Sequence, residues 1–425
     1  MIKTNKIYKS KYLNWFTQHL LILIFILAFF LRVAPNIYLE LRQQGWHINN
    51  INEMEFYYDD VARSLIVGKG FVHSVNPRSQ NSLYKFEPGT PFRFVPPLYA
   101  WWLGLVYFIF GPNVLIAKIL QCLMDASVCL LLYKIGRTIT DNRVSLTAAF
   151  LYAVYPLAIY TSTRLYYQIP MNLALCWLIV SFAAPVNLKN GMWTGMAMAL
   201  SALAKPVTLP FLLLLPIIRI LEGFKEKVPI KSSLLWFLSF LLAASIILIP
   251  WTIRNYSVFH RLIPIQDGSG FPLIQGSKEE YIDMDVNKLF KEHGQNLGAM
   301  HEQFAEIAVQ NHLNHLKEAP LDYLRFSGKK FLLTWYNTEG KTKNFLTLLI
   351  QLPFLAFALF AFMIALKFWL KRPNWYISGL ILYITGIQVV FYPLARYTLA
   401  IMPLVMLLSA FGLNKLLVSL KIFEK

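Results

Sequence analysis

The chain has 425 residues and a formal net charge of +18, from 40 Lys and Arg against 22 Asp and Glu. Hydrophobic residues make up 56% of it and charged residues only 15%, whereas soluble globular proteins are about 25% charged. This composition excludes an ordinary soluble domain and indicates an all-α polytopic membrane protein. The basic excess is typical of cytoplasmic loops and membrane surfaces, so it does not indicate a nucleic-acid partner.

Apolar runs long enough to cross a hydrocarbon core of ~30 Å recur along the chain. They predict about ten spans, at 17–34, 113–134, 144–160, 169–186, 191–205, 207–222, 233–251, 345–366, 374–391 and 397–417. A further apolar stretch, 97–110, is short for a span. We interpret it as a juxtamembrane or re-entrant helix, because counting it as a span would place the later basic loops outside.

Positive charge decides the orientation of these spans. Lys and Arg concentrate in the short connections and at both chain ends, which places both termini in the cytoplasm. The two long connections, 35–112 and 252–344, then face outward. In the second, Phe304, Ile307 and Ala308 follow helical spacing, which predicts a small, partly helical extracytoplasmic cap.

The chain accordingly divides into three parts. We predict an N-terminal transmembrane catalytic module over 1–254, an extracytoplasmic region over 255–344, and C-terminal transmembrane helices over 345–425.

The first long connection contains an acidic cluster. Four of the 22 acidic residues, Glu53, Glu55, Asp59 and Asp60, fall within eight positions. The neighbouring apolar residues share one helical face: Tyr58, Val61, Ala62, Leu65 and Ile66. Glu55 lies at the edge of this face, Asp59 just outside it and Asp60 nearly opposite. The pattern predicts a short amphipathic helix that holds one or two carboxylates at a boundary between protein and water.

Two interpretations of this helix remain open at this point. In one, Glu55 completes a capping box with Asn52 as the N-cap, and the two Asp side chains are simply solvated. In the other, the carboxylates belong to an active site at the outer surface.

Several cations reach the same side of the membrane. Lys205 lies between the fifth and sixth spans, Arg254 ends the seventh, and Arg396 opens the tenth, while Arg164 and Gln168 lie between the third and fourth. Any one of these charges could be a snorkelling anchor. Three cations gathered beside an acidic helix favour a site for a lipid-linked phosphate.

Other polar residues give weaker signals. Asp125 lies midway along the second span, where it either lines a cavity or forms an interhelical hydrogen bond, for example with Asn172. His312 and His315 have helical spacing but lack the accompanying ligands of a metal site, so we interpret them as surface histidines. We assign no metal ligands.

The order of these motifs resembles GT-C glycosyltransferases, the relatives of protein O-mannosyltransferases and lipid A aminoarabinose transferases. The resemblance begins with the spacing of Glu55, Tyr58, Ala62, Leu65, Gly68, Gly70 and Phe71. It continues through Pro96-Pro97-Leu-Tyr-Ala-Trp-Trp, the Ile249-Pro-Trp-Thr-Ile-Arg254-Asn-Tyr segment and Arg396-Tyr397, and it covers most of residues 20–415.

This resemblance implies a GT-C fold and an inverting transfer of sugar from a polyprenyl-phosphate donor to an acceptor hydroxyl or phosphate. The carboxylate that takes the acceptor proton would be Glu55, ahead of Asp59 and Glu53. The donor phosphate would be bound by Arg254, Arg396 and Lys205. Substrate contacts would come from Tyr58, Gln168, Arg164 and Tyr397.

Three positions depart from the family pattern. Glu55 stands where the family usually has Asp, which keeps the chemistry on a longer side chain. Gln168 stands where an acidic residue is common, and it can only form hydrogen bonds. Lys205 replaces the commoner Arg, which keeps the charge but loses the bidentate geometry.

The resemblance also implies the setting of the reaction: a multi-pass protein of the bacterial plasma (inner) membrane with its site on the extracytoplasmic side. The acceptor would be a lipid, glycan or protein. The sequence neither requires nor excludes a divalent cation as cofactor. Two alternatives stay open, a transporter or flippase of lipid-linked sugars and a catalytically silent relative that acts as a partner subunit.

Overall fold

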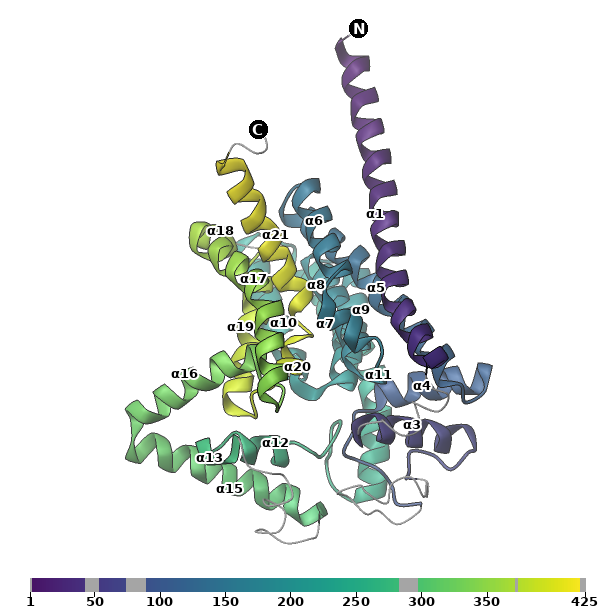
Figure 1. The fold of residues 1–425 in the computed structure, drawn as a ribbon, viewed down its shortest axis with the longest axis vertical. Helices are drawn as coiled ribbons and strands as arrows, with labels where there is room; N and C mark the ends of the chain where they lie inside the picture. Colours follow the sequence, from purple (N-terminus) through teal and green to yellow (C-terminus); the bar gives the residue numbers. More distant parts are fainter. Residues whose placement is uncertain (1, 43–52, 74–88, 283–296, 371–373, 421–425) are drawn as a thin grey trace.

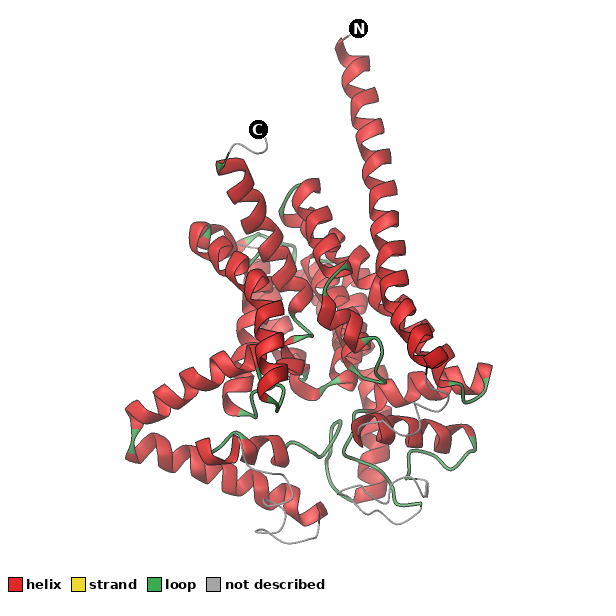
Figure 2. Cartoon of the chain, viewed as in Figure 1, coloured by secondary structure: helices red, strands yellow, loops and turns green. Residues whose placement is uncertain are grey.

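A computed structural model describes residues 2–42, 53–73, 89–282, 297–370 and 374–420 of the chain. These residues form helices joined by short loops (Figure 2). The described residues contain no β-strand, only one isolated antiparallel bridge between Val72 and Pro91. The all-α architecture predicted from the composition is therefore confirmed.

Each predicted span corresponds to helical structure. The helices are α1 (Ile2–Arg42), α5 (Val114–Ile139), α6 (Asn142–Ala153), α7 (Pro156–Thr161), α8 (Gln168–Ala183), α9 (Leu188–Ala204), α10 (Phe211–Lys225), α11 (Ile230–Phe259), α17 (Lys341–Ile364), α19 (Trp375–Val390) and α21 (Met402–Ser419). Among the described residues, six helices are long and apolar enough to cross a membrane. The six are Trp15–Arg42, Val114–Ile139, Pro206–Lys225, Ile230–Phe259, Lys341–Ile364 and Met402–Ser419.

The two ends of the bundle contain different parts of the chain. Figure 1 shows both chain termini at one end, and at the other end the helices of the two long connections. These are α3 (Glu53–Ile66), α4 (Pro97–Phe110), α12 (Gly270–Gln275), α13 (Glu279–Ile282), α15 (Leu297–Glu318) and α16 (Pro320–Tyr336). Short elements complete the chain: the 3₁₀ turn η2 (Pro206–Thr208), α18 (Leu366–Trp369) and α20 (Ala395–Thr398).

The predicted third span, 144–160, is divided into α6 and α7. Tyr155 precedes Pro156, which disfavours helical backbone before it and favours a new helix start at the proline itself. The break leaves carbonyls without helical partners. Arg32 of α1 satisfies two of them, because its guanidinium donates to the carbonyls of Tyr152 (3.1 Å) and Ala153 (2.9 Å).

Asp125 completes this buried polar network. Its carboxylate pairs with Arg32 and accepts a hydrogen bond from the Tyr152 hydroxyl at 2.6 Å. Asn172 donates to the same hydroxyl at 3.2 Å. Asp125 and Asn172 thus share a network through Tyr152. Asp125 does not line either of the two cavities at the outer end of the bundle.

Helices α9 and α11 approach each other at two glycines of α9. A Cβ atom on Gly191 would lie 2.3 Å from the Trp236 carbonyl oxygen, and one on Gly195 would lie 2.2 Å from that of Phe240. The Gly-x-x-x-Gly spacing places both on one face of α9, which is a common way for membrane helices to pack closely.

The outer end has its own small core. Ile274, Tyr281, Phe304 and Ala308 pack together between α12, α13 and α15. Phe304 and Ala308, which were predicted from their helical spacing, therefore lie on the buried face of α15, as expected for a partly helical cap. The second helix of this region, α16, was not predicted.

Candidate active site

The acidic helix α3 is buried on more than one face. Glu55 is 4% exposed, Asp59 7% and Asp60 2%. This burial contradicts one of the two interpretations, in which both Asp side chains are solvated. Helix α4 packs against one side of α3, and the segment around His73 covers another. The Val72–Pro91 bridge holds that segment in place.

The three carboxylates of α3 whose side chains are described, those of Glu55, Asp59 and Asp60, have different partners. Glu55 forms an ion pair with Arg164 at 2.5 Å. Asp59 accepts hydrogen bonds from Arg63 Nε (2.8 Å) and the Tyr107 hydroxyl (2.6 Å). Asp60 lies 3.1 Å from His73 Nδ1. The Glu53 side chain and Asn52 lie outside the described residues, so the capping interpretation keeps its status as a prediction.

Buried hydrogen bonds position the partner of Glu55. The Tyr99 hydroxyl donates to Gln121 Oε1 at 2.6 Å, and Gln121 Nε2 donates to the Arg164 carbonyl at 2.7 Å. Lys118 of α5 is also buried and interacts electrostatically with Glu55. Arg164 is thus held at a defined place beside α3.

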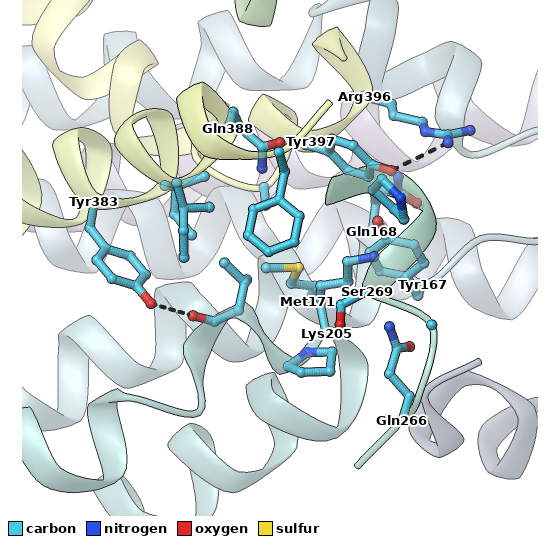
Figure 3. Close-up of a pocket in the computed structure, with 18 of the residues that line it drawn as sticks. Tyr167, Gln168, Met171, Lys205, Gln266, Ser269, Tyr383, Gln388, Arg396 and Tyr397 are labelled. Carbon is cyan, nitrogen blue, oxygen red and sulfur yellow. Dashed lines mark hydrogen bonds between the residues drawn. The ribbon is translucent and has the colours of Figure 1, made fainter. Parts of the chain in front are cut away.

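A cavity of about 280 Å³ lies between the start of α8, the end of α9, α19 and the segment after α11. Figure 3 shows Lys205, Tyr167, Gln168 and Tyr397 gathered on one side of it, with Ser269 and Gln266 beside them. The remaining wall is largely apolar and includes Met171, Ile384 and Ile387.

The two cations of this cavity have no carboxylate partner among the described residues. Arg396 donates to the hydroxyls of Tyr166 (3.1 Å) and Tyr397 (3.4 Å), and its buried Nε has no partner. The Lys205 ammonium makes no hydrogen bond or ion pair with any described residue and lies over the Tyr167 and Tyr397 rings, at 5.1 and 5.2 Å from their centroids. Both side chains are half-buried. Half-buried cations without counter-charges form a site for an anion, and guanidinium and ammonium groups match phosphate oxygens.

A second cavity of about 710 Å³ adjoins the first. Gln168 and Arg396 line both, so the two share a polar boundary. Arg164 lines only the second. The ion pair of Glu55 with Arg164 therefore links the acidic helix to the second cavity. Lys205 lines only the first cavity, and Arg396 lines both.

Arg254 is not among the residues that line these cavities. Its guanidinium donates to the carbonyls of Phe92 (3.2 Å) and Phe71 (2.9 Å) and thereby fastens the end of α11 to the loop after α3. Its proposed contact with phosphate keeps the status of a prediction.

Tyr58 is fully buried against Tyr99, with ring centroids 5.0 Å apart. Burial raises the pKa of the Tyr58 phenol, while Tyr166 and Arg396 act on that pKa in opposite directions. Tyr58 lines neither cavity, so its predicted contact with substrate stays a prediction.

The histidines of the cap have ordinary partners. His315 pairs with Asp322 at 2.9 Å, and His312 Nε2 lies 3.1 Å from the Val390 carbonyl oxygen. In the described parts of the chain, no three His, Cys, Asp or Glu side chains form a group that could hold a metal ion.

The sequence prediction missed four residues that shape the site. They are Lys118, Tyr166, Gln266 and Lys343. Tyr166 lies between two predicted residues, Arg164 and Gln168, so its position alone could have indicated a role. Lys118, Gln266 and Lys343 are not next to any predicted site residue in the sequence. Only the tertiary fold brings them to the site.

Comparison with known proteins gives one family and one fold. Residues 95–253, from α4 to α11, match the model of the dolichyl-phosphate-mannose-protein mannosyltransferase family. The oligosaccharyltransferase AglB of Archaeoglobus fulgidus, in complex with an inhibitory peptide and a dolichol-phosphate, superposes with a TM-score of 0.54 at 13% identity over 96% of this chain and 51% of that one. The oligosaccharyltransferase of the same organism tethered to an acceptor peptide gives 0.56 at 14% identity over 96% and 50%.

The chain thus spans about half the length of these structures, and at such low identity the likeness concerns the fold alone. A comparison of the sequence with curated proteins gives no match.

Proposed function

The chain is a membrane protein with the fold of GT-C glycosyltransferases, and we propose that it is an inverting glycosyltransferase that uses a polyprenyl-phosphate-sugar donor. One observation carries the proposal: two half-buried cations without carboxylate partners among the described residues, Lys205 and Arg396, line one cavity. A second cavity shares Arg396 and is lined by Arg164, which pairs with the buried Glu55 carboxylate. The family-model match over α4 to α11 supports the same reading.

In the proposed reaction, the first cavity holds the donor. Lys205 and Arg396 bind the phosphate, and Gln168, Tyr167 and Tyr397 surround it. As the acceptor oxygen attacks the anomeric carbon, the bond between that carbon and the phosphate oxygen breaks. The polyprenyl phosphate leaves with the bonding electrons, and the two cations stabilise its added negative charge.

Glu55 supplies the base in this scheme. Its carboxylate takes the proton of the acceptor hydroxyl, and the ion pair with Arg164 orients it toward the second cavity. The reaction site lies at the end of the bundle opposite the basic termini, so the positive-inside rule supports an extracytoplasmic site in a bacterial plasma membrane.

Binding of the leaving lipid tests the anion site. We expect Arg396→Ala and Lys205→Ala, purified in nanodiscs, to bind undecaprenyl phosphate about 10–100-fold more weakly, since each loses a charge-assisted hydrogen bond worth about 1.5–3 kcal/mol. Arg261→Ala, which removes an exposed cation of the outer loop, is the control. Wild-type affinity in both site variants would contradict the proposal, and Arg254→Ala tests its predicted contact in the same series.

Transfer of sugar separates an enzyme from its rivals. Wild-type protein should release undecaprenyl phosphate from at least one of a panel of polyprenyl-phosphate sugars when an acceptor extract is added, with and without a chelator to test for a divalent cation. Lipid binding without any turnover would favour a transporter or a silent relative instead.

A further inference from the structure

The second cavity has one cationic wall. Three cations line it, Arg164, Lys343 and Arg396, and no Asp or Glu is among its described lining residues. Lys343 lies in the first turn of α17, is exposed, and forms no ion pair with any described residue. The Glu55 carboxylate offsets Arg164, which leaves Arg396 and Lys343 as uncompensated positive charge at this cavity.

Apolar side chains of α7, α17 and the segment after α20 also line this cavity. Leu157, Ile350 and Leu399 line it, and its rim includes Tyr160 and Leu346, which are 60% and 51% exposed. Large apolar side chains that are exposed on a membrane-spanning bundle face the hydrocarbon of the bilayer. The cavity is therefore accessible from the membrane between α7 and α17.

A cationic wall and a lateral apolar opening together match one class of ligand. We propose that the acceptor is an anionic amphiphile that enters the second cavity from the outer leaflet, with its acyl chain between α7 and α17 and its anionic headgroup on Lys343. This inference rests on the proposed glycosyltransferase function, and it makes Lys343 a residue that determines acceptor specificity.

The acceptor, not the donor, is assigned to this cavity because of the base. Glu55 itself lines neither cavity, but its ion-pair partner Arg164 lines the second cavity and not the first. The acceptor hydroxyl must meet the base, so the acceptor is placed on the side of Arg164. The leaving phosphate needs both Lys205 and Arg396, and Lys205 lines only the first cavity.

Lipid binding to delipidated protein, measured by native mass spectrometry, tests this assignment. The probes are phosphatidylglycerol, phosphatidylcholine and undecaprenyl phosphate. We expect phosphatidylglycerol to bind more tightly than phosphatidylcholine, and Lys343→Ala to weaken phosphatidylglycerol binding about tenfold while undecaprenyl phosphate binding is unchanged. Lys341→Ala is the matched control, because Lys341 is an exposed cation of the same helical turn that does not line the cavity.

Three results would overturn the inference. The first is equal affinity of wild type and Lys343→Ala for phosphatidylglycerol. The second is equal affinity of the wild type for the two phospholipids. The third is a Lys343→Ala defect confined to undecaprenyl phosphate binding, which would make this the donor cavity. Failure of the proposed function looks different: Arg396→Ala and Lys205→Ala would keep their affinity for undecaprenyl phosphate while the Lys343 effect persists.

Discussion

Glu55 and Asp59 lie one helical turn apart on α3, yet their side chains are engaged very differently. Both oxygens of Asp59 accept short hydrogen bonds, one from Arg63 and one from Tyr107. Glu55 instead pairs with Arg164, which lines a cavity large enough for a substrate group. At the scale of single residues, these contacts favour Glu55 as the base and Asp59 as a structural carboxylate that joins α3 to α4.

We expect Glu55→Gln to lower kcat by about 10²–10⁴-fold, the usual contribution of a general base. Asp59→Asn is the matched control, since it removes a buried, ion-paired carboxylate from the same helix. Both variants should lose some thermal stability, but only Glu55→Gln should lose turnover at normal donor binding. The reverse pattern in a transfer assay would move the base to Asp59.

At the scale of elements, the break between α6 and α7 depends on a charge that comes from another helix. Arg32 satisfies the carbonyls at the end of α6, and Asp125 neutralises Arg32; both side chains are almost fully buried. The pair stabilises a helix break that brings the α7–α8 segment, with Arg164, next to α3.

Asp125→Asn leaves the Arg32 charge buried without a counter-charge, which typically costs roughly 3–5 kcal/mol. We therefore expect a clear fall in Tm in detergent. Combined replacement of the pair, Arg32→Met with Asp125→Leu, should recover part of the loss. An unchanged Tm in Asp125→Asn would show that the pair does not stabilise the break.

Helix α16 attaches the cap to the bundle through a buried lysine. Lys330 Nζ donates to the carbonyls of Gly276 (2.5 Å) and Val390 (3.1 Å), and burial lowers the pKa of Lys330 from 10.5 to about 7. Between these two pH values the unfolded state binds the extra proton, so the free energy of unfolding rises with pH in this window.

The wild type should accordingly gain stability between pH 7 and pH 10 relative to Lys330→Met, which lacks the titrating group. Lys329→Met, at an exposed neighbour that pairs with Glu279, should keep the wild-type dependence. Thermal unfolding across this pH range measures the difference. Parallel curves for wild type and Lys330→Met would contradict the assignment.

For the molecule as a whole, the orientation in the membrane decides on which side the reaction occurs. Both termini lie at one end of the bundle, and α3 and the cap helices lie at the other (Figure 1). The proposed base, Glu55, belongs to α3. The positive-inside rule predicts that this second end is extracytoplasmic.

Cysteine labelling of intact cells tests this orientation. Glu280 and Lys189 are exposed at opposite ends, and the native Cys122, Cys129 and Cys176 are buried, so background labelling should be low. Glu280→Cys should react with an impermeant maleimide from outside and Lys189→Cys only after lysis. External labelling at position 189 would place the site in the cytoplasm.

The class of protein and most of its helices follow from local features of the sequence. The length of an apolar run can be read directly from the sequence. Comparing that length with the thickness of the bilayer shows whether a helix can span the membrane. Local spacing likewise indicated α3 and the buried face of α15, because helical periodicity needs no information from distant residues. The order of motifs pointed to the GT-C fold, which the structure confirms.

The partners of the charged side chains could be found only from the folded structure. Arg396 meets Tyr166 across 230 positions and Arg254 meets Phe71 across 183, and no local pattern records such contacts. The same holds for the burial of Asp60, the pairing of Arg32 with Asp125 and the two adjoining cavities. A charged side chain in a low-dielectric interior is governed by its nearest partner, and the packing of distant helices determines which partner that is.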